Sequence, residues 1–485
     1  MGQPAARSLG EIRGGRPGDS MPQADIPGKV GPDTGDPVAE PISSRDGGDG
    51  GLVKSVERWI EEQLRPQGFA LPLIKRVSFV VAGLLKAESA QRGDLVTALD
   101  QLKASSAQPA SVARRIVRTL NDPRLDPGRI LPNILKPHLP MLLAELLAEH
   151  TLSSASASDR EHERGFPLLR VVVDESTKVD EVHILVAGLA YQGIVIPLAI
   201  RVWPQNHSLP PEEYRSHLVS LLSSVEDILP GVLRQHVLLL ADRAYGRPDF
   251  IDLVEALGWH YVIRIQGQTQ IKLSDEASLA ARDFVKQPGE VWCSGFNPDS
   301  YPKALAAFKK SGWRPCQFVA AWALDPPEAD WLLITNLSAS NERFLEYADR
   351  WWIERTFLAW KSHGWDIESL QMSQPVRFGR YLVAIALATL WTLACAVAHT
   401  TILIHDRQAS PRAPRRAVVQ LPLPFAEFKT DRRPRLGKIS LLTWGRRVLH
   451  QASCQTSTPP IRWRLPDWHA PAWFIHSEQL LAADS

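Results

Sequence analysis

The spacing of apolar residues distinguishes the first third of the chain from the remainder. Between residues 51 and 150 apolar positions recur every three to four residues, as in SVERWIEEQL and PMLLAELLAEH, and Pro-rich turns such as DPRLDPG interrupt them. This pattern predicts a helical N-terminal domain over 51–160. Residues 1–50 are rich in Gly, Pro and Asp without an apolar segment, which predicts a disordered tail that is neither a signal peptide nor an anchor.

From residue 167 onward the apolar residues gather in short β-branched runs typical of strands. Five strands are expected, at 167–174, 182–190, 194–202, 236–242 and 259–265. The pair Gln192-Gly193 predicts a hairpin turn between the second and third. Helical spacing follows the third strand, and a helix opened by Pro248 follows the fourth. The order β-β-β-α-β-α-β predicts an α/β core with a mixed five-stranded sheet.

Two more segments complete the core. Residues 267–340 read as short strands separated by turns, which predicts a β-rich insertion, and helical spacing returns over 341–405. Within the latter, the apolar run from Leu382 to Ile404 comes close to a membrane-spanning helix in length and apolarity. His399, several Thr and Ala residues, and the lack of a second candidate favour a buried helix instead.

Composition narrows the class of protein only slightly. The 485 residues are 44% hydrophobic and 22% charged, as in ordinary globular proteins. Four cysteines lie far apart without a C-x-x-C motif, which argues against a zinc site, a disulfide framework and a secreted origin. We therefore expect a cytoplasmic protein.

The basic residues are unevenly distributed. The net charge is only +2, yet the segment between 411 and 447 contains ten Lys or Arg and two acidic residues. This basic C-terminal region, 406–485, suits a polyanionic partner, and a solvated tail explains it equally well. Arg114, Arg115 and Arg118 share one short helical segment, which is typical of a DNA-reading helix and also of a solvated surface.

Two aspartates stand where predicted strands hand over to loops. Asp174 ends the first strand, in VVVDESTK, and Asp242 ends the fourth, in LLLADRAYG. Functional side chains gather at the carboxyl ends of strands in α/β sheets. Since the first and fourth strands are neighbours in this order, the two carboxylates are expected side by side. A turn or helix-capping role is the alternative for each.

A third carboxylate lies in YADRWWIERTFLAWK, at residues 347–361. On one helix, Tyr347, Arg350, Glu354 and Lys361 fall within a stripe roughly 60° wide. A solvated face with an Arg350–Glu354 ion pair explains this spacing. So does a site in which Glu354 binds metal and its three companions hold phosphates.

Three converging carboxylates repel one another unless they bind cations, and all-oxygen sites select Mg²⁺ or Mn²⁺. Two such ions can activate a water or a 3′-hydroxyl and stabilise the leaving oxygen of a phosphodiester. Other carboxylates near these motifs lack both the strand end and the Tyr–Arg–Lys stripe; they are Glu175, Asp180, Asp249, Glu346 and Glu368.

These residues resemble the DDE transposases of bacterial insertion sequences, of the insertion-sequence-four type, whose signature is Y-x2-R-x3-E-x6-K. The stripe over 347–361 matches it in residues and spacing, and DESTK and ADRAYG precede it in the right order. The resemblance implies a ribonuclease H-like catalytic core, with its first part over 161–266, the insertion over 267–340 and its second part over 341–405.

The resemblance also implies roles for individual residues. Asp174, Asp242 and Glu354 would be the catalytic metal ligands for Mg²⁺ or Mn²⁺. The contacts to DNA would come from Tyr347, Arg350 and Lys361, which suit phosphates, and from Arg243, Tyr245 and Thr177. Trp292 or Trp313 could stack on an extruded base, although a core role is commoner among sixteen Trp residues.

The implied function is metal-dependent DNA cleavage at transposon ends and strand transfer into target DNA. The implied partners are the inverted-repeat ends, the target DNA and a second copy of the chain in the DNA complex, in the bacterial cytosol or nucleoid and without a membrane. A stand-alone DNA endonuclease would carry the same site. A domesticated DNA-binding protein without catalysis is the third alternative, and the presence of all three carboxylates disfavours it.

Overall fold

The computed structural model describes ten stretches of the chain and four residues beyond them. These are 51–136, 169–178, 181–191, 193–205, 209–229, 231–273, 277–294, 306–322, 330–361 and 364–408, with Leu442, Gly445, Arg446 and Leu449. The tail predicted for residues 1–50 and most of the basic C-terminal region lie outside the described residues.

Five helices follow the pattern predicted for the start of the chain. They are α1 (Gly51–Leu64), α2 (Leu71–Ala87), α3 (Arg92–Gln101), α4 (Pro109–Leu120) and α5 (Pro127–Leu135). A proline in the first turn opens α2, α4 and α5, where its missing N–H removes no helical hydrogen bond. The helices share one hydrophobic core with the sheet, because α5 packs on β3 and α2 packs on α11.

The five expected strands form in the expected order. They are β1 (Leu169–Lys178), β2 (Val182–Tyr191), β3 (Ile194–Pro204), β4 (Val237–Ala241) and β5 (His260–Arg264). They lie side by side as β3-β2-β1-β4-β5, with β1, β4 and β5 parallel and β2 antiparallel to both of its neighbours. Tyr191 pairs with Ile194 across a two-residue turn in which Gly193 has a φ of +86°, as predicted for a hairpin.

The predicted number of strands was wrong, because the insertion extends the main sheet to eight strands. Strand β12 (Asp330–Thr335) pairs antiparallel with β5, and β11 (Gln317–Trp322) and β8 (Val291–Cys293) follow it. Without β12 the N–H and C=O groups of β5 would form an unpaired sheet edge. The other strands of the insertion make a separate four-stranded sheet, β10 (Arg314–Pro315), β9 (Ala306–Ala307), β6 (Gln270–Lys272) and β7 (Ser278–Ala280).

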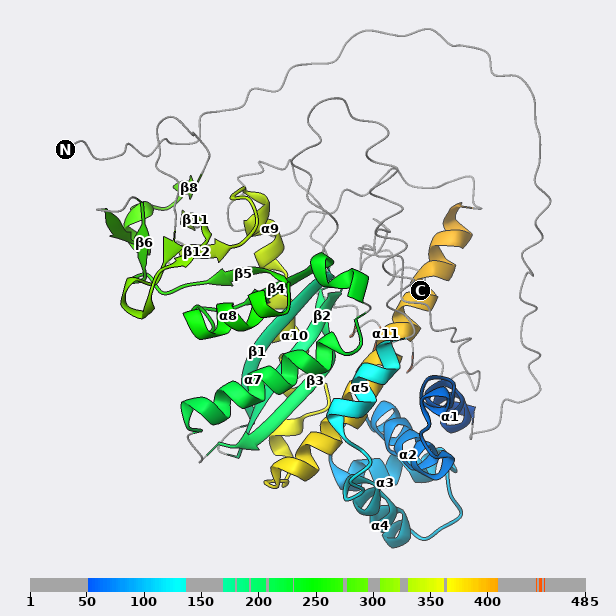
Figure 1. The fold of residues 1–485 in the computed structure, drawn as a ribbon. Helices are drawn as coiled ribbons and strands as arrows, with labels where there is room; N and C mark the ends of the chain where they lie inside the picture. Colours follow the sequence, from blue (N-terminus) through cyan, green and yellow to red (C-terminus); the bar gives the residue numbers. More distant parts are fainter. Residues whose placement is uncertain are drawn as a thin grey trace, which may run out of the picture.

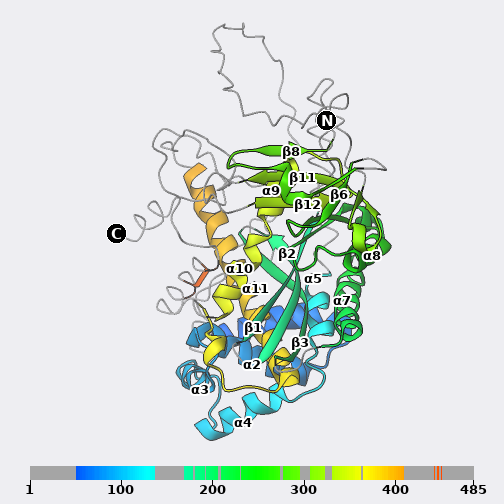
Figure 2. The same cartoon turned by 90° about the vertical axis from the view of Figure 1, so that its left-hand side faces the viewer.

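Helices cover both faces of the main sheet (Figures 1 and 2). On one face lie α7 (Pro211–Glu226) and α8 (Pro248–Ala256), and on the other lies α10 (Trp351–Lys361), preceded by α9 (Glu342–Ala348). The long helix α11 (Pro375–Gln408) runs beside β3, α5 and α2.

Helix α11 carries the apolar run that raised the question of a membrane. Within the described ranges one helical stretch, Pro375–Ala396, is long and apolar enough to span a membrane, and 94% of its apolar window is buried inside the protein. Side chains from Leu382 to Ala396 pack into the common core. The prediction of a buried helix is confirmed for this stretch.

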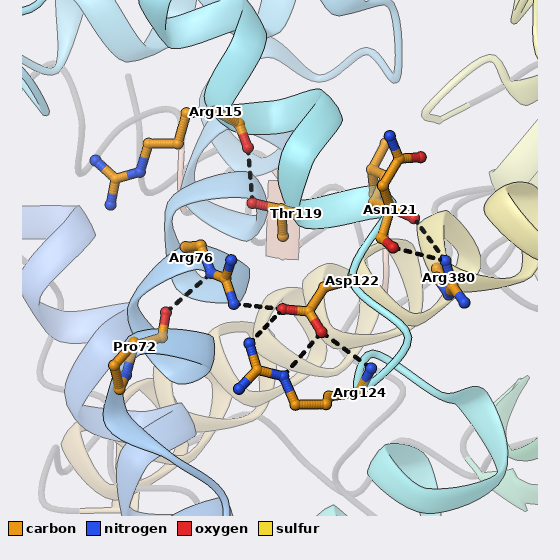
Figure 3. Close-up of polar contacts among 9 residues, drawn as sticks. Pro72, Arg76, Arg115, Thr119, Asn121, Asp122, Arg124 and Arg380 are labelled. Carbon is orange, nitrogen blue, oxygen red and sulfur yellow. Dashed lines mark hydrogen bonds and ion pairs between the residues drawn. The ribbon is translucent and has the colours of Figure 1, made fainter.

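The turn after α4 ties the N-terminal helices to α11 (Figure 3). Asp122 accepts hydrogen bonds from Arg76 and Arg124, and the Arg124 side chain holds the pKa of this carboxyl well below its usual range. From α11, Arg380 Nη1 donates to the Asn121 carbonyl at 3.0 Å, and Arg377 Nε donates to the Asn121 side chain at 2.8 Å. Arginines here fasten one helix to another.

Candidate active site

Asp174 and Asp242 occupy neighbouring positions, one on β1 and the other directly after β4. The parallel register pairs Val173 with Ala241, so the next residue on each strand is one of the two aspartates. Strand β1 nevertheless continues to Lys178, because β2 stays paired with it as far as Val182. The prediction that Asp174 ends its strand was therefore wrong. What ends there is the pairing with β4.

Asp242 also shapes the turn that follows β4. Its Oδ1 accepts the N–H of Ala244 at 2.8 Å, so the turn role considered as an alternative is real. This contact uses one oxygen of the carboxylate. The Asp174 carboxylate likewise accepts the N–H of Glu175 through Oδ1, at 2.8 Å, and turns Oδ2 toward Arg350. Each aspartate is held by backbone through one oxygen, which fixes its orientation.

The segment that carries Glu354 is not one helix, contrary to prediction. Helix α9 ends at Ala348 and α10 begins at Trp351. Between them the N–H groups of Asp349 and Arg350 bond three residues back, at 3.2 and 3.0 Å, instead of four. Buried Asp349 forms an ion pair with Arg170 of β1, which anchors this turn to the sheet.

Arg350 lies between two of the three carboxylates. Its Nη1 donates to Asp174 Oδ2 at 3.1 Å and its Nη2 donates to Glu354 Oε1 at 2.5 Å. The Arg350 side chain is 8% exposed, against 14% for Asp174 and 45% for Glu354. The guanidinium carbon lies 4.9 Å from the ring centroid of Trp351. The predicted Arg350–Glu354 pair is thus present, between a buried arginine and an exposed glutamate.

The electrostatics of Asp174 show that the three carboxylates act on one another. Burial raises the pKa of Asp174 to about 6, Arg350 and the Glu175 N–H oppose the rise, and Asp242 and Glu354 add to it. A carboxyl whose charged form is disfavoured by burial and by like charges is typical of functional sites.

These residues have the right chemistry to hold a divalent ion. Asp174, Asp242 and Glu354 supply only oxygen ligands, which suit Mg²⁺ or Mn²⁺. Among the residues that the structure describes, however, no group of three or more His, Cys, Asp or Glu side chains is close enough together to hold a metal ion. The Arg350 guanidinium lies between two of the three, so metal binding requires this side chain to move.

The other predicted DNA contacts lie at various depths. Tyr347 is buried, with its ring 5.3 Å from that of Trp331, and burial raises its pKa. Lys361 Nζ lies 3.1 Å from Glu368 Oε1. In the turn after β4, Arg243 is exposed and Tyr245 is buried.

Strand alternation directs Thr177 to the side of β1 opposite to Asp174. The structure thus gathers Tyr347 and Arg350 with the carboxylates and leaves Lys361 and Thr177 in other surroundings. The roles of these residues in DNA binding stay predictions.

The two tryptophans named as base-stacking candidates differ in their surroundings. Trp292, in β8, lies 4.6 Å from the ring of Phe284 and 5.5 Å from that of Phe318, so it packs in an aromatic cluster. Trp313 is half-buried between β9 and β10. The core role expected for most tryptophans therefore fits Trp292.

Sequence reasoning missed a second polar cluster behind the site. Glu175 accepts a hydrogen bond from Tyr214 at 3.2 Å and contacts Nδ1 of His183, whose ring stacks on Trp203 at 5.1 Å. It lies on the face of β1 opposite to Asp174. No motif links these residues, because Tyr214 is 39 positions from Glu175 and reaches it through the packing of α7 on β3 and β2.

Comparison with known proteins agrees with this geometry. Residues 218–391 match the sequence model of the family described as "Transposase DDE domain". This part of the chain is similar to the DDE domains of transposases. The match contains Asp242, Arg350 and Glu354, whereas Asp174 lies before it. DDE domains of transposases generally use divalent metal ions and take part in DNA transposition and recombination.

The other comparisons give no finer assignment than this family match. No curated protein matches the chain. A similar solved structure is titled "Cryo-EM structure of piggyBac transposase synaptic complex with hairpin DNA (SNHP)"; it is 10% identical, and the alignment covers 74% of this chain and 80% of that one with a TM-score of 0.29. At that TM-score the two structures are too different for residues to be compared.

Proposed function

We propose that the protein is a transposase of the insertion-sequence-four type, which cleaves DNA at the ends of its element and transfers the cut strands into target DNA. The observation that carries the proposal is that buried Arg350 bridges Asp174 of β1 and Glu354 of α10, with Asp242 directly after β4 at the position beside Asp174. The fixed spacing of Tyr347, Arg350, Glu354 and Lys361 supports the finer family assignment. The core is ribonuclease H-like in this proposal.

In this proposal the three carboxylates hold Mg²⁺ or Mn²⁺. The bound ions supply activation of a water or 3′-hydroxyl and stabilisation of the leaving oxygen. The backbone contacts of Asp174 and Asp242 orient these ligands before substrate arrives. Arg350 and Lys361 bind phosphates of the DNA end, and exposed Arg243 beside Asp242 reaches the same strand. The partners are the inverted-repeat ends, target DNA and a second protomer, in the bacterial cytosol.

The test uses the full chain and the inverted repeats from the DNA that flanks its coding region. A pre-cleaved end incubated with Mg²⁺ and a target plasmid should become covalently joined to the plasmid, as read on a gel. Cleavage of a plasmid carrying both ends, without any joining, would identify a stand-alone endonuclease. Binding of the ends with neither reaction would identify a DNA-binding protein that has lost catalysis.

A further inference from the structure

The Arg350 guanidinium engages the two carboxylates that a bound cation would need. Its two terminal nitrogens reach Asp174 on β1 and Glu354 on α10, at 3.1 and 2.5 Å. Because these carboxylates come from different elements, one planar fork links the sheet to the helix. A divalent ion with oxygen ligands would compete for the same oxygens. The arginine and the ion therefore exclude each other at these two residues.

The surroundings of Arg350 strengthen its ion pairs with the two carboxylates and also include a partly exposed aromatic ring. Its side chain is 8% exposed, and Nε is buried without a hydrogen-bond partner among the described residues. Charges attract more strongly where water is excluded. On its other side the guanidinium faces the ring of Trp351, which is 46% exposed. The buried guanidinium thus contacts an aromatic ring that is itself partly exposed to solvent.

We propose that Arg350 is an internal counter-ion that a divalent metal ion displaces, and that the displaced guanidinium is then free to bind a DNA phosphate. The inference rests on the metal site of the proposed function. While Arg350 bridges Asp174 and Glu354, its single positive charge offsets part of their negative charge, and the guanidinium is withdrawn from DNA. A divalent ion at these carboxylates would take over the role of counter-ion and release the guanidinium. Bound metal consequently raises the affinity of the protein for DNA, and bound DNA raises its affinity for metal, because both depend on the Arg350 side chain.

Calcium binding to the full chain, measured by titration calorimetry, tests the displacement without any catalytic reaction. Arg350→Gln should bind Ca²⁺ roughly tenfold more tightly than wild type, a typical size for coupling between sites. Arg350→Lys should fall between the two, because an ammonium keeps the charge but lacks the fork that bridges two carboxylates. The lysine variant also keeps the test decisive if the glutamine variant fails to fold.

Arg355 provides the matched control. It lies on the same helix next to Glu354, is exposed, and directs Nη1 toward the turn at Gly193. Arg355→Gln removes the same charge without touching the carboxylates, so its Ca²⁺ affinity should stay within about twofold of wild type because solvent screens the exposed charge. Equal gains in Arg350→Gln and Arg355→Gln would mean that charge alone matters, and would overturn the inference.

The second measurement is DNA binding, by fluorescence anisotropy with a duplex of the inverted repeat. Calcium should raise the DNA affinity of wild type and of Arg355→Gln, and should have no such effect in Arg350→Gln. A calcium effect of the same size in all three proteins would overturn the coupling. Failure of both wild type and Arg350→Gln to bind Ca²⁺ would instead refute the metal site itself, so failure of the inference and failure of the proposed function give different results.

Discussion

Helix α4 and the turn that leads into α10 both carry arginines, yet these arginine side chains have opposite surroundings. On α4, Arg114 and Arg118 are exposed, and the Arg115 guanidinium lies 4.0 Å from the ring centroid of Phe79. In the turn that leads into α10, Arg350 is buried between two carboxylates. Only the residues brought in from other elements distinguish an arginine that covers a hydrophobic surface from one that balances a charged site.

The largest expected effect separates the carboxylates of the site from other carboxylates. Asp174→Asn, Asp242→Asn and Glu354→Gln should each lower the cleavage rate by on the order of 10³-fold or more, because each removes a metal ligand. DNA-end binding should change little. Asp249→Asn is the control, since Asp249 is 44% exposed and pairs with Arg247 near Asp242. Cleavage gels in Mg²⁺ measure the rates, and near-normal cleavage by any of the three site variants would refute the assignment.

The next effect concerns the arginines that fasten α4 to α2. Asp122→Asn should lower the free energy of unfolding by about 2–3 kcal/mol, because it leaves Arg76 and Arg124 without their buried counter-ion. Ca²⁺ affinity should not change, in contrast to Arg350→Gln. Denaturant melts and calorimetry on the same preparation measure both quantities. A large change in Ca²⁺ affinity would show that the two arginine clusters are not independent.

The stability of the folded protein should also depend on pH through Asp174. Because the pKa of Asp174 is raised from 3.8 to about 6, the folded protein holds this proton more tightly than the unfolded chain does. The stabilising contribution is therefore fully present below pH 3.8 and is lost as the pH rises through about 6. In EDTA, Asp174→Asn should gain about 2–3 kcal/mol of stability relative to wild type between pH 4 and pH 7. Denaturant melts across this range measure the difference, and a constant difference would contradict the raised pKa.

The smallest effect is expected for the exposed face of α4. Arg114→Gln and Arg118→Gln should change the free energy of unfolding by less than about 0.5 kcal/mol, as is usual for exposed positions. If this face binds DNA, each variant should reduce the slope of log affinity against log salt by roughly one unit. An unchanged slope would leave α4 with a structural role only, and the comparison with α10 would become sharper.

The five central strands of the main sheet could be predicted from the sequence, but the strands that extend the sheet beyond β5 could not. Alternating apolar runs predicted β1 to β5 and their order, because local patterning determines which strands face the core. The pairing of β12 with β5 was not predictable, since it joins residues about 70 positions apart through backbone hydrogen bonds. For the same reason the break after Ala348 was missed, because it depends on the ion pair of Asp349 with distant Arg170.

The candidate site likewise has residues that could be predicted from the sequence and contacts that could not. Asp174, Asp242 and Glu354 could be named from strand ends and motif spacing, but the position of Arg350 between two of them could not. An ion-pair geometry depends on the distance between β1 and α10, which no periodicity reports. The partners of Glu175 were hidden for a similar reason, as they come from β2 and α7.

The pairing of β12 with β5 limits how such proteins can be recombined in the laboratory. Because β12 is bonded into the main sheet and leads within a few residues to α9 and then to Glu354, the insertion is not a removable module. A chimera that replaces only the chain between β5 and β12 keeps the sheet edge and the carboxylate in place. One that also replaces β12 exchanges the strand that leads into the catalytic helix, and the donor must then supply a strand of matching register.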